Sequence, residues 1–199
     1  MLKQRKLILA SGSSRRKELL EQIGLEFVVL PSQCEEVITS TSPEQVVQEL
    51  ALQKAQDVAA RQTEGIVLGS DTVVAYDGKI LGKPATKEEA IEMLTMLQGN
   101  THQVYTGVAL VDCEKKENAP KVFCEQTEVI VYPMTATEIQ SYVDSGDPMD
   151  KAGSYGIQGA FGAYIKGIQG DYYNVVGLPI GRVYQELKQM SCFMDGSEN

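Results

Sequence analysis

Long hydrophobic runs are missing from this 199-residue sequence. The apolar runs at residues 7–10 and 66–68 have the length of a strand, whereas a membrane-spanning helix needs about 20 apolar residues. The basic start at residues 1–6 is followed by an apolar segment that is too short for the core of a secretory signal. The sequence therefore predicts a cytoplasmic protein that has no membrane partner.

Cysteine and histidine motifs are missing as well. The four cysteines, Cys34, Cys113, Cys124 and Cys192, are widely spread and form no C-x-x-C pair. The single histidine, His102, cannot complete a zinc finger, and no Ser-His-Asp or Cys-His set can be assembled around it. We expect reduced thiols, as in most intracellular proteins, and a structural role for His102.

Positive charge is scarce, because 18 Lys and Arg residues stand against 27 Asp and Glu residues and the net charge is −9. A protein that binds nucleic acid needs a basic surface for the phosphate backbone, so we expect no nucleic-acid partner. The Walker P-loop, G-x-G-x-x-G and H-E-x-x-H motifs are also absent. A small anion can still bind where a few cations gather in one place.

Hydrophobic patterns and turn signals indicate alternating strands and helices. Strands are expected at residues 6–10, 27–30, 66–68, 103–111 and 122–132. Helices are expected at residues 14–24, from residue 42, and at 86–99, 135–143 and 179–190. Hairpins are expected at residues 72–81 and 164–176. This mixture predicts an α/β fold with a mixed sheet and antiparallel hairpins, in a single domain over residues 1–190 with a frayed tail at 191–199.

Two of the expected helices carry capping signals at their starts. Ser42, followed by Pro43 and Gln45, combines an N-cap residue, a proline at the first helical position and a capping-box partner. Thr86 and Glu89 have the same capping-box spacing. We therefore expect side-chain capping at both starts.

The segment at residues 11–16 reads SGSSRR and joins an expected strand to an expected helix. Backbone N–H groups and the positive dipole end at a helix start make such a turn an anion site. Arg15, Arg16 and Lys17 crowd the first turn, where cations oppose the helix dipole. A bound phosphate would resolve this conflict for Arg15 and Arg16. The alternative, which we favour for Lys17, is that the side chains simply face solvent.

Two acidic positions also follow expected strands. Asp71 comes after the strand at residues 66–68, and open α/β sheets place their ligands at strand ends. A carboxylate there can hold a divalent metal or accept a proton from water, and an ordinary turn aspartate is an equally good interpretation. The pair Glu35 and Glu36 lies just past the strand at residues 27–30 and suits a metal site, although such acidic pairs are common.

Two lysines and one glycine-rich loop complete the candidates. Lys54 emerges from the apolar face of its helix, either to snorkel to the surface or to aim its amine into a cleft. Lys83 sits on a loop beside a proline and is a candidate phosphate partner or a plain surface lysine. Residues 150–159 read DKAGSYGIQG, which indicates a loop that approaches a ligand closely rather than a merely flexible one.

Together these motifs resemble the Maf family. The matching segments are LASGSSRR at 9–16, KA at 54–55, GSDT at 69–72, GKP at 82–84, DKAGSYGIQG at 150–159 and GDYYNVVGLP at 170–179. Their order and spacing cover nearly the whole chain, and the combination is specific although each piece alone is not. One departure is Ser14, which replaces the proline of the family's S-x-S-P-R-R, and serine can still begin a helix.

The resemblance implies an elongated, two-lobed α/β domain with a central cleft, assembled as a homodimer. It implies hydrolysis of a nucleoside triphosphate to the monophosphate and pyrophosphate with a divalent cation, Mg²⁺ or Mn²⁺. Asp71 is the implied proton acceptor, and Asp71 and Glu36 are the implied metal ligands. The implied substrate-binding residues are Ser11, Arg15, Arg16, Glu36, Lys54, Thr72, Lys83 and Gln158.

The specificity groups of this family differ at three positions, which here hold Arg15, Thr72 and Gln158. That trio resembles the dTTP/UTP group. The amide of Gln158 offers a donor and an acceptor, which can pair with the 2,4-dione edge of a pyrimidine. Thr72 leaves room for the base, and Arg15 can bridge the base and phosphate sides. The alternative is that Gln158 only braces the glycine-rich loop.

Two other functions stay open at this point. The first is a pyrophosphatase that acts on another triphosphate, such as a methylated GTP or a deaminated purine. The second is a nucleotide-binding regulator of cell division that has no catalytic activity. The products formed from each triphosphate separate these possibilities.

Overall fold

Three apolar segments build the parallel part of the sheet. The computed structural model describes residues 3–115, 117–190 and 193–194. In it, β2 (Leu7–Leu9) pairs in parallel with β3 (Phe27–Val29) on one side and with β4 (Ile66–Tyr76) on the other. All three residues of β2 are buried, as expected for a strand that is covered on both faces.

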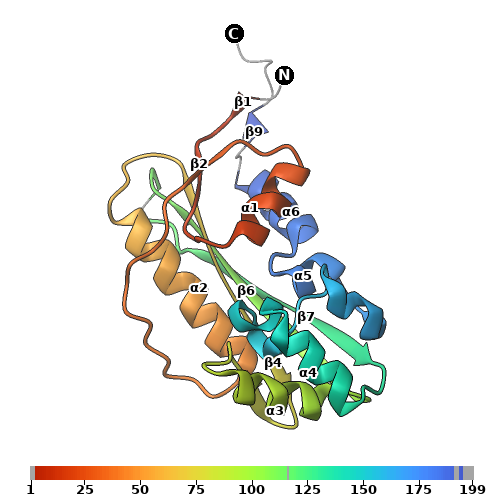
Figure 1. The fold of residues 1–199 in the computed structure, drawn as a ribbon. Helices are drawn as coiled ribbons and strands as arrows, with labels where there is room; N and C mark the ends of the chain where they lie inside the picture. The colour runs from red at the N-terminus through yellow and green to blue at the C-terminus, as the bar shows by residue number, and fades with distance from the viewer. Residues whose placement is uncertain (1–2, 116, 191–192, 195–199) are drawn as a thin grey trace. The chain divides into compact units, whose positions relative to one another are not determined.

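The sheet is mixed, and its strands follow the order β3-β2-β4-β6-β7-β8, with β5 paired to β4. The pairs β4–β5 and β7–β8 are antiparallel. The remaining strands are β5 (Lys79–Leu81), β6 (Thr101–Asp112), β7 (Lys121–Val131) and β8 (Ile165–Gln169), and a separate pair joins β1 (Lys3–Gln4) to β9 (Phe193–Met194). The predicted α/β fold with a mixed sheet and antiparallel hairpins is confirmed (Figure 1).

Six α-helices accompany these strands in the part of the chain that the structure describes. They are α1 (Ser14–Gln22), α2 (Pro43–Ala59), α3 (Lys87–Leu97), α4 (Ala136–Asp144), α5 (Tyr172–Val176) and α6 (Ile180–Gln189). Across the same residues, none of the helices is long and apolar enough to cross a membrane.

The chain divides into two compact units. Unit 1 comprises the residues up to Asp71, Thr106–Cys124 and the residues from Gly177 onward. Unit 2 comprises Thr72–Tyr105 and Glu125–Val176. The central cleft implied by the family resemblance stays a prediction.

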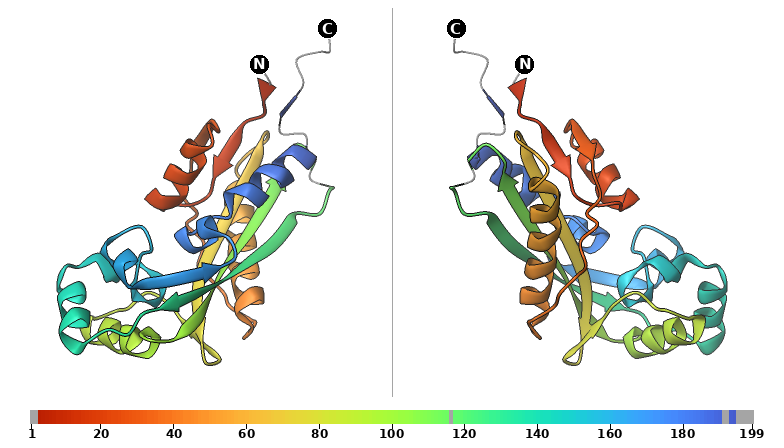
Figure 2. Two further views of the ribbon diagram at one scale, coloured as in Figure 1. Left: turned by 90° about the vertical axis from the view of Figure 1, so that its right-hand side faces the viewer. Right: turned by 90° about the vertical axis from the view of Figure 1, so that its left-hand side faces the viewer.

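In unit 1, helix α2 packs directly onto the sheet. A Cβ atom on Gly69 of β4 would clash with the backbone of Ala51 and with the backbone N and Cβ of Ala55. A Cβ atom on Gly107 of β6 would likewise clash with the backbone of Val47. Helix α6 covers the other face of this part of the sheet (Figures 1 and 2), where the guanidinium of Arg182 lies 4.3 Å from the ring centre of Phe123. Glycine is therefore required at both points where α2 touches the sheet.

In unit 2, α3 and α4 lie side by side (Figure 2). They pack against a core that contains several aromatic rings. The ring of Phe161 lies 4.7 Å from that of Tyr155 and 5.2 Å from that of Tyr142. His102 is fully buried here, and its Nε2 lies 2.7 Å from the hydroxyl oxygen of Tyr155. Burial lowers the pKa of His102 to about 4, so the ring is neutral near pH 7. The structural role expected for His102 is confirmed.

The two predicted helix caps have different outcomes. Thr86 accepts a hydrogen bond from the backbone N–H of Glu89 and caps α3, as predicted. Ser42 precedes α2 with N-cap backbone angles, but its side chain makes no capping bond, so that prediction was wrong. The physical reason is that Pro43 holds a helical φ and has no N–H to satisfy, and it begins the helix without help from a side chain.

The expected hairpin at residues 164–176 is also wrong, because only β8 is a strand and α5 follows it. The aromatic and β-branched residues of this segment favour a strand. Tertiary hydrogen bonds override that preference. The side-chain amide of Asn174 is fully buried and donates to Val104 O and to Thr127 Oγ1. Asp171 Oδ1 accepts a hydrogen bond from Tyr173 N and begins the helical turn.

A third correction concerns Asp71, which lies inside β4 rather than at a strand end. The parallel pairing of β4 with β2 stops at Leu68, but β4 continues to Tyr76, where it pairs with β5. Gly69 directly follows the strand expected at residues 66–68, but it does not interrupt β4. The α2 backbone approaches this residue closely and leaves no space for a side chain.

The structure tests only part of the remaining predictions on cysteines, the C-terminal tail and domain organisation. Cys34, Cys113 and Cys124 form no disulfide among the described residues, whereas Cys192 lies outside them. Most of the predicted frayed tail at residues 191–199 also lies outside them. The single domain over residues 1–190 stays a prediction.

We predict that Gly107→Ala lowers the stability of the protein, because the new methyl group would overlap the α2 backbone at Val47. Forcing an extra methyl group into a packed core costs about 1–3 kcal/mol, and backbone atoms yield less readily than side chains. Urea unfolding of the purified variant measures the change. Gly167→Ala in β8 is the matched control, because no atom lies within 4 Å of the added carbon. Equal losses in both variants would contradict the prediction.

Candidate active site

The turn between β2 and α1 places three polar side chains of unit 1 together. Ser11 follows β2 and is buried, and its Oγ accepts hydrogen bonds from Ser13 N at 3.3 Å and from Arg16 Nη1 at 3.0 Å. Ser13 is the N-cap residue of α1, and Ser14 is the first helical residue. The helix thus begins where the sequence predicted it, although proline is absent at that position. The first turn contains no acidic residue, which keeps the positive end of the helix open to an anion.

Arg16 is held from two sides. Its Nη1 bonds Ser11, and its Nε donates to Gly177 O at 2.9 Å. Gly177 has a φ of 130°, a conformation that only glycine adopts readily. Burial lowers the pKa of Arg16 below its ordinary value. The negative charge of Asp71 offsets part of this decrease, and the positive charge of the neighbouring Arg15 lowers the pKa further. An arginine stays charged in proteins, so Arg16 offers a fixed, oriented guanidinium.

Lys54 is the centre of a second cluster in the same unit. It projects from α2, and its Nζ lies 2.6 Å from Asp71 Oδ1 and 2.8 Å from Glu36 Oε1. The side chains of Lys54 and Asp71 are each 17% exposed, and that of Glu36 is 49% exposed. Burial lowers the pKa of Lys54, but the two carboxylates more than offset this, so the pKa lies above its ordinary value. Lys54 is therefore an ion-paired ammonium and not a lysine that merely snorkels to the surface.

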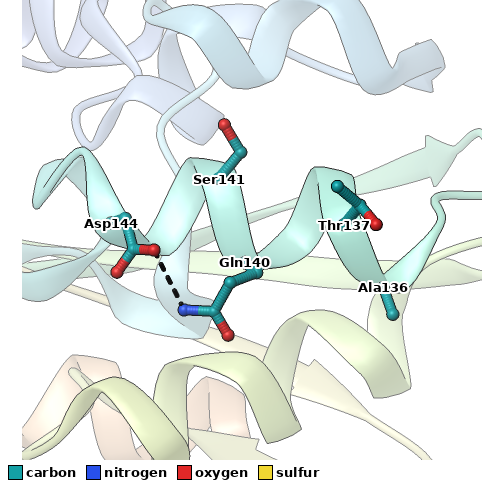
Figure 3. A pocket seen from close by; sticks show the side chains of 5 residues that line it. All are labelled: Ala136, Thr137, Gln140, Ser141 and Asp144. Atoms are coloured by element: carbon teal, nitrogen blue, oxygen red, sulfur yellow. Dashed lines mark hydrogen bonds between the residues drawn. The ribbon is translucent and has the colours of Figure 1, made fainter.

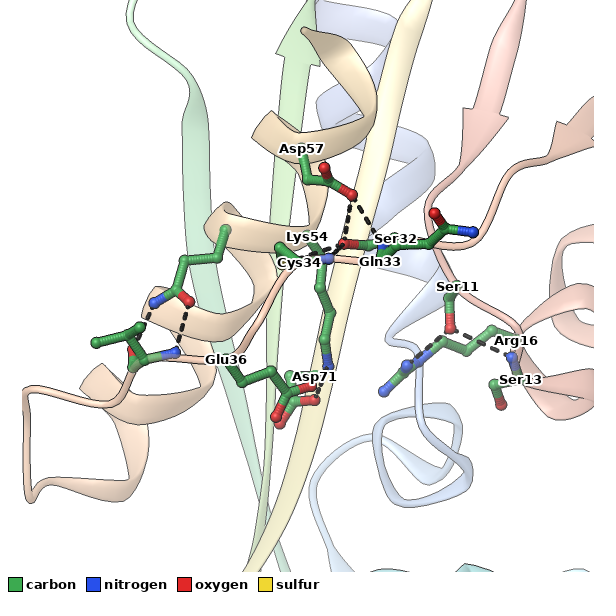
Figure 4. Close-up of polar contacts among 12 residues, drawn as sticks. Ser11, Ser13, Arg16, Ser32, Gln33, Cys34, Glu36, Lys54, Asp57 and Asp71 are labelled. Carbon is green, nitrogen blue, oxygen red and sulfur yellow. Dashed lines mark hydrogen bonds and ion pairs between the residues drawn. The ribbon is translucent and has the colours of Figure 1, made fainter. Parts of the chain in front are cut away.

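The two clusters face each other within unit 1. Figure 4 shows Lys54, Asp71 and Glu36 on one side and the guanidinium of Arg16 extending toward them from the other. The effect of Asp71 on the pKa of Arg16 is consistent with that proximity. The structure thus brings together Ser11, Arg16, Glu36, Lys54 and Asp71, with Arg15 next to Arg16 in the chain.

The other predicted residues belong to unit 2. Thr72 is half-buried in β4, and Lys83 is exposed after β5. Gln158 is exposed in the glycine-rich loop, and its amide has no hydrogen-bond partner among the residues that the structure describes. The amide is therefore not what braces the loop.

Other side chains hold the glycine-rich loop in place. The hydroxyl of Tyr142 accepts a hydrogen bond from Gly156 N and donates one of 2.6 Å to Asp147 Oδ2. Lys151 Nζ donates to the backbone oxygen and to Oδ1 of Asp147, and to Asp150 Oδ1. Lys151 thus serves the loop itself, which the sequence did not predict.

A surface hollow of about 550 Å³ lies on α4 in unit 2 (Figure 3). It is lined by Ala136, Thr137, Gln140, Ser141 and Asp144. None of the predicted site residues lines it, and its only charged lining group is Asp144. This hollow is therefore not the site that the sequence motifs indicate.

The described residues contain no group of three or more His, Cys, Asp or Glu side chains that could hold a metal ion. Asp71 and Glu36 form a carboxylate pair that shares Lys54. Mg²⁺ is usually bound by one or two carboxylates, with substrate phosphates and water as its remaining ligands. This donor set therefore fits a divalent cation that arrives with a phosphate ligand.

Known proteins resemble this chain in sequence and in fold. The family described as Maf-like protein matches residues 6–190. A dTTP/UTP pyrophosphatase of Agathobacter rectalis is 54% identical over 198 residues, covering 92% of this chain and 97% of that protein. A dTTP/UTP pyrophosphatase of Bacillus anthracis is 54% identical over 188 residues, covering 94% of this chain and 96% of that protein. A HAM1 protein from Coxiella burnetii has the same fold, with a TM-score of 0.52 at 18% identity, over 92% of this chain and 98% of that one.

Proposed function

The chain belongs to the Maf family, and on that premise we propose that it hydrolyses dTTP and UTP to the nucleoside monophosphate and pyrophosphate. The observation that carries this proposal is the cluster of Lys54, Asp71 and Glu36 facing the guanidinium of Arg16. It combines a candidate proton acceptor with cations for phosphate oxygens. Relatives that share more than half of the sequence are named dTTP/UTP pyrophosphatases.

The phosphates bind at the turn between β2 and α1. Backbone N–H groups at the start of α1 and the side chains of Ser11, Arg15 and Arg16 supply donors for their oxygens. Arg16 is pre-oriented by Ser11 and by Gly177, so little side-chain freedom is lost on binding. Lys83 adds a further cation. These groups stabilise the negative charge that develops as pyrophosphate leaves.

Asp71 accepts the proton of the attacking water. Its Oδ1 is bound by Lys54 at 2.6 Å, and a carboxylate has a second oxygen that can take the proton. The attack breaks the bond between the α- and β-phosphates, so the hydroxyl joins the α-phosphorus and pyrophosphate departs. Lys54 holds the carboxylate in position during this step.

Asp71 and Glu36 would also hold a divalent cation, Mg²⁺ or Mn²⁺, that enters with the triphosphate. Such a cation supplies Lewis-acid polarisation of a phosphoryl oxygen. The charge balance of the unit 1 residues supports it, because Arg15, Arg16 and Lys54 stand against the two carboxylates. That small excess of positive charge is far below the negative charge of a triphosphate.

The base is read by Gln158, with Thr72 leaving room and Arg15 bridging the base and phosphate sides. The amide of Gln158 is exposed and has no partner among the described residues, so both its donor and its acceptor are available. A pyrimidine dione edge offers acceptors beside a donor, which matches that amide.

The proposal also includes the domain organisation, the oligomeric state and the cellular location of the protein. We place the activity in a single catalytic domain over residues 1–190 that acts as a homodimer in the cytoplasm. Cys34, Cys113 and Cys124 form no disulfide among the described residues, which agrees with a reducing compartment. Nucleic acid is not a partner, since the chain carries a net charge of −9.

We expect the purified protein to convert dTTP and UTP with Mg²⁺ or Mn²⁺ into the monophosphate and pyrophosphate, and to cut them far faster than GTP or ATP. Chromatography identifies the products. Release of orthophosphate would show that a different bond is cut. Rapid turnover of a methylated GTP or deaminated purine would assign another substrate. Tight binding without turnover would support the nucleotide-binding regulator.

Asp71→Asn should lower kcat by at least about a hundredfold, the usual scale for losing a positioned acid–base group. The change removes the charge with little change in volume, so the circular dichroism spectrum should be retained. Asp144→Asn is the matched control, because it removes the same charge from an exposed position on α4. A kcat close to the wild-type value in Asp71→Asn would overturn the role assigned to this residue.

Gln158→Glu should shift the preference away from dTTP and UTP by about ten- to a hundredfold, because an amide donor is lost and a charge is left unpaired. The ratio of kcat/KM for dTTP to that for GTP measures the shift. Gln56→Glu, an exposed change on α2, controls for the added charge. An unchanged ratio in Gln158→Glu would remove this residue from base recognition.

A further inference from the structure

The segment that carries Glu36 has no regular secondary structure, yet it follows α2 closely. It joins β3 to α2, and residues 30–41 form neither helix nor strand. Val37 and Ile38 are 57% and 55% exposed, so burial of their side chains does not hold the segment. Hydrogen bonds and the Glu36–Lys54 ion pair join the segment to α2 instead.

Three polar residues of α2 make these bonds. Glu49, Gln53 and Asp57 are spaced at four-residue intervals, so they form one stripe along the helix. Near the C-terminal end of α2, Asp57 Oδ2 accepts hydrogen bonds from Ser32 Oγ at 2.8 Å and from Gln33 N at 2.9 Å. The hydrogen bond from the Gln33 backbone N–H, and then that from the Ser32 hydroxyl, lower the pKa of Asp57 below its ordinary value.

Nearer the N-terminal end of α2, Glu49 binds the segment through two consecutive residues. Its carboxylate accepts from the backbone N–H and the hydroxyl of Thr39, and from the same two groups of Ser40. The bonds from Ser40 and Thr39 lower the pKa of Glu49 to about 2, so the carboxylate stays ionised in any ordinary assay buffer.

Gln53 makes the central contact of the stripe. Its Oε1 accepts from Val37 N at 3.0 Å, and its Nε2 donates to Val37 O at 2.6 Å. The side-chain amide thus pairs with a backbone residue as a neighbouring strand would. Gln53 precedes Lys54 on the helix, and Val37 follows Glu36 on the segment. The Gln53–Val37 pair therefore sets the register in which Glu36 meets Lys54 at 2.8 Å (Figure 4).

We propose that Glu49, Gln53 and Asp57 are positioning residues that hold Glu36 against Lys54 and Asp71, with Gln53 as the residue that sets the register. The inference rests on the proposed function, because Glu36 is there a ligand of the divalent cation. None of the three residues needs to touch the substrate. They act on the reaction only through the placement of the Glu36 carboxylate.

The test compares Gln53→Ala with Gln56→Ala, which removes the same side chain from an exposed position on the same helix. Gln53→Ala should raise the hydrogen-exchange rate of the Val37 amide about tenfold, the scale of one to two lost hydrogen bonds. It should lower kcat about tenfold and raise the Mn²⁺ concentration for half-maximal rate, with KM for dTTP changed less than about threefold. Gln56→Ala should match the wild type in every measurement.

A double-mutant cycle separates positioning from general stabilisation. In a Glu36→Gln background, Gln53→Ala should lower kcat no further, because the carboxylate that it positions is already gone. A further drop of the same size would show that Gln53 does not act through Glu36 and would overturn the proposal. Glu49→Ala is the second variant, and it should show the same pattern with faster exchange at Thr39 and Ser40.

The exchange measurement needs no substrate, so it distinguishes a failure of the positioning role from a failure of the proposed function. A wild-type protein that leaves dTTP and UTP intact would overturn the proposed function. A wild-type protein that cuts both, with an unchanged Val37 exchange rate in Gln53→Ala, would overturn the positioning role and leave the function standing.

Discussion

The close contact between the backbone of α2 and the sheet is the constraint on which the candidate site depends. Gly69 leaves space for the turn of α2 that contains Ala51 and Ala55, which is also the turn from which Lys54 projects. Asp71 lies two residues beyond Gly69 on the same strand, so the distance between helix and strand decides whether the ammonium reaches the carboxylate. A residue with a side chain at position 69 would push α2 away from β4 and lengthen the 2.6 Å ion pair between Lys54 and Asp71. The absence of a side chain at Gly69 thus sets both the packing of α2 on the sheet and the Lys54–Asp71 ion pair.

Much of the fold follows from local patterns. The apolar runs, the Thr86 cap and the hairpin expected at residues 72–81 each indicate an element that the structure contains. Two of the wrong predictions concern places where a long-range contact decides the conformation. Gly69 signals the end of a strand only if the helix above it is unknown. The segment Tyr172–Val176 favours a strand until the buried bonds of Asn174 are considered.

The candidate site was predictable to a similar degree. Charged and small residues beside strands pointed to Ser11, Arg16 and Asp71, whereas the shared contact of Lys54 with Glu36 required the three-dimensional structure. The stripe of Glu49, Gln53 and Asp57 leaves a visible pattern in the sequence, since the three recur at four-residue intervals. A polar stripe on a helix usually faces water, however, and nothing in the irregular segment opposite identifies its partner.

The exposed amide of Gln158 has a consequence for how such a protein can evolve. The loop around it is braced by Tyr142, Asp147 and Lys151, and Gln158 adds no hydrogen bond to that bracing among the described residues. A mutation at this position therefore costs the fold little while altering what the loop presents. With the role proposed for Gln158 in base recognition, a substitution at this position would change nucleotide preference at little cost to the stability of the loop.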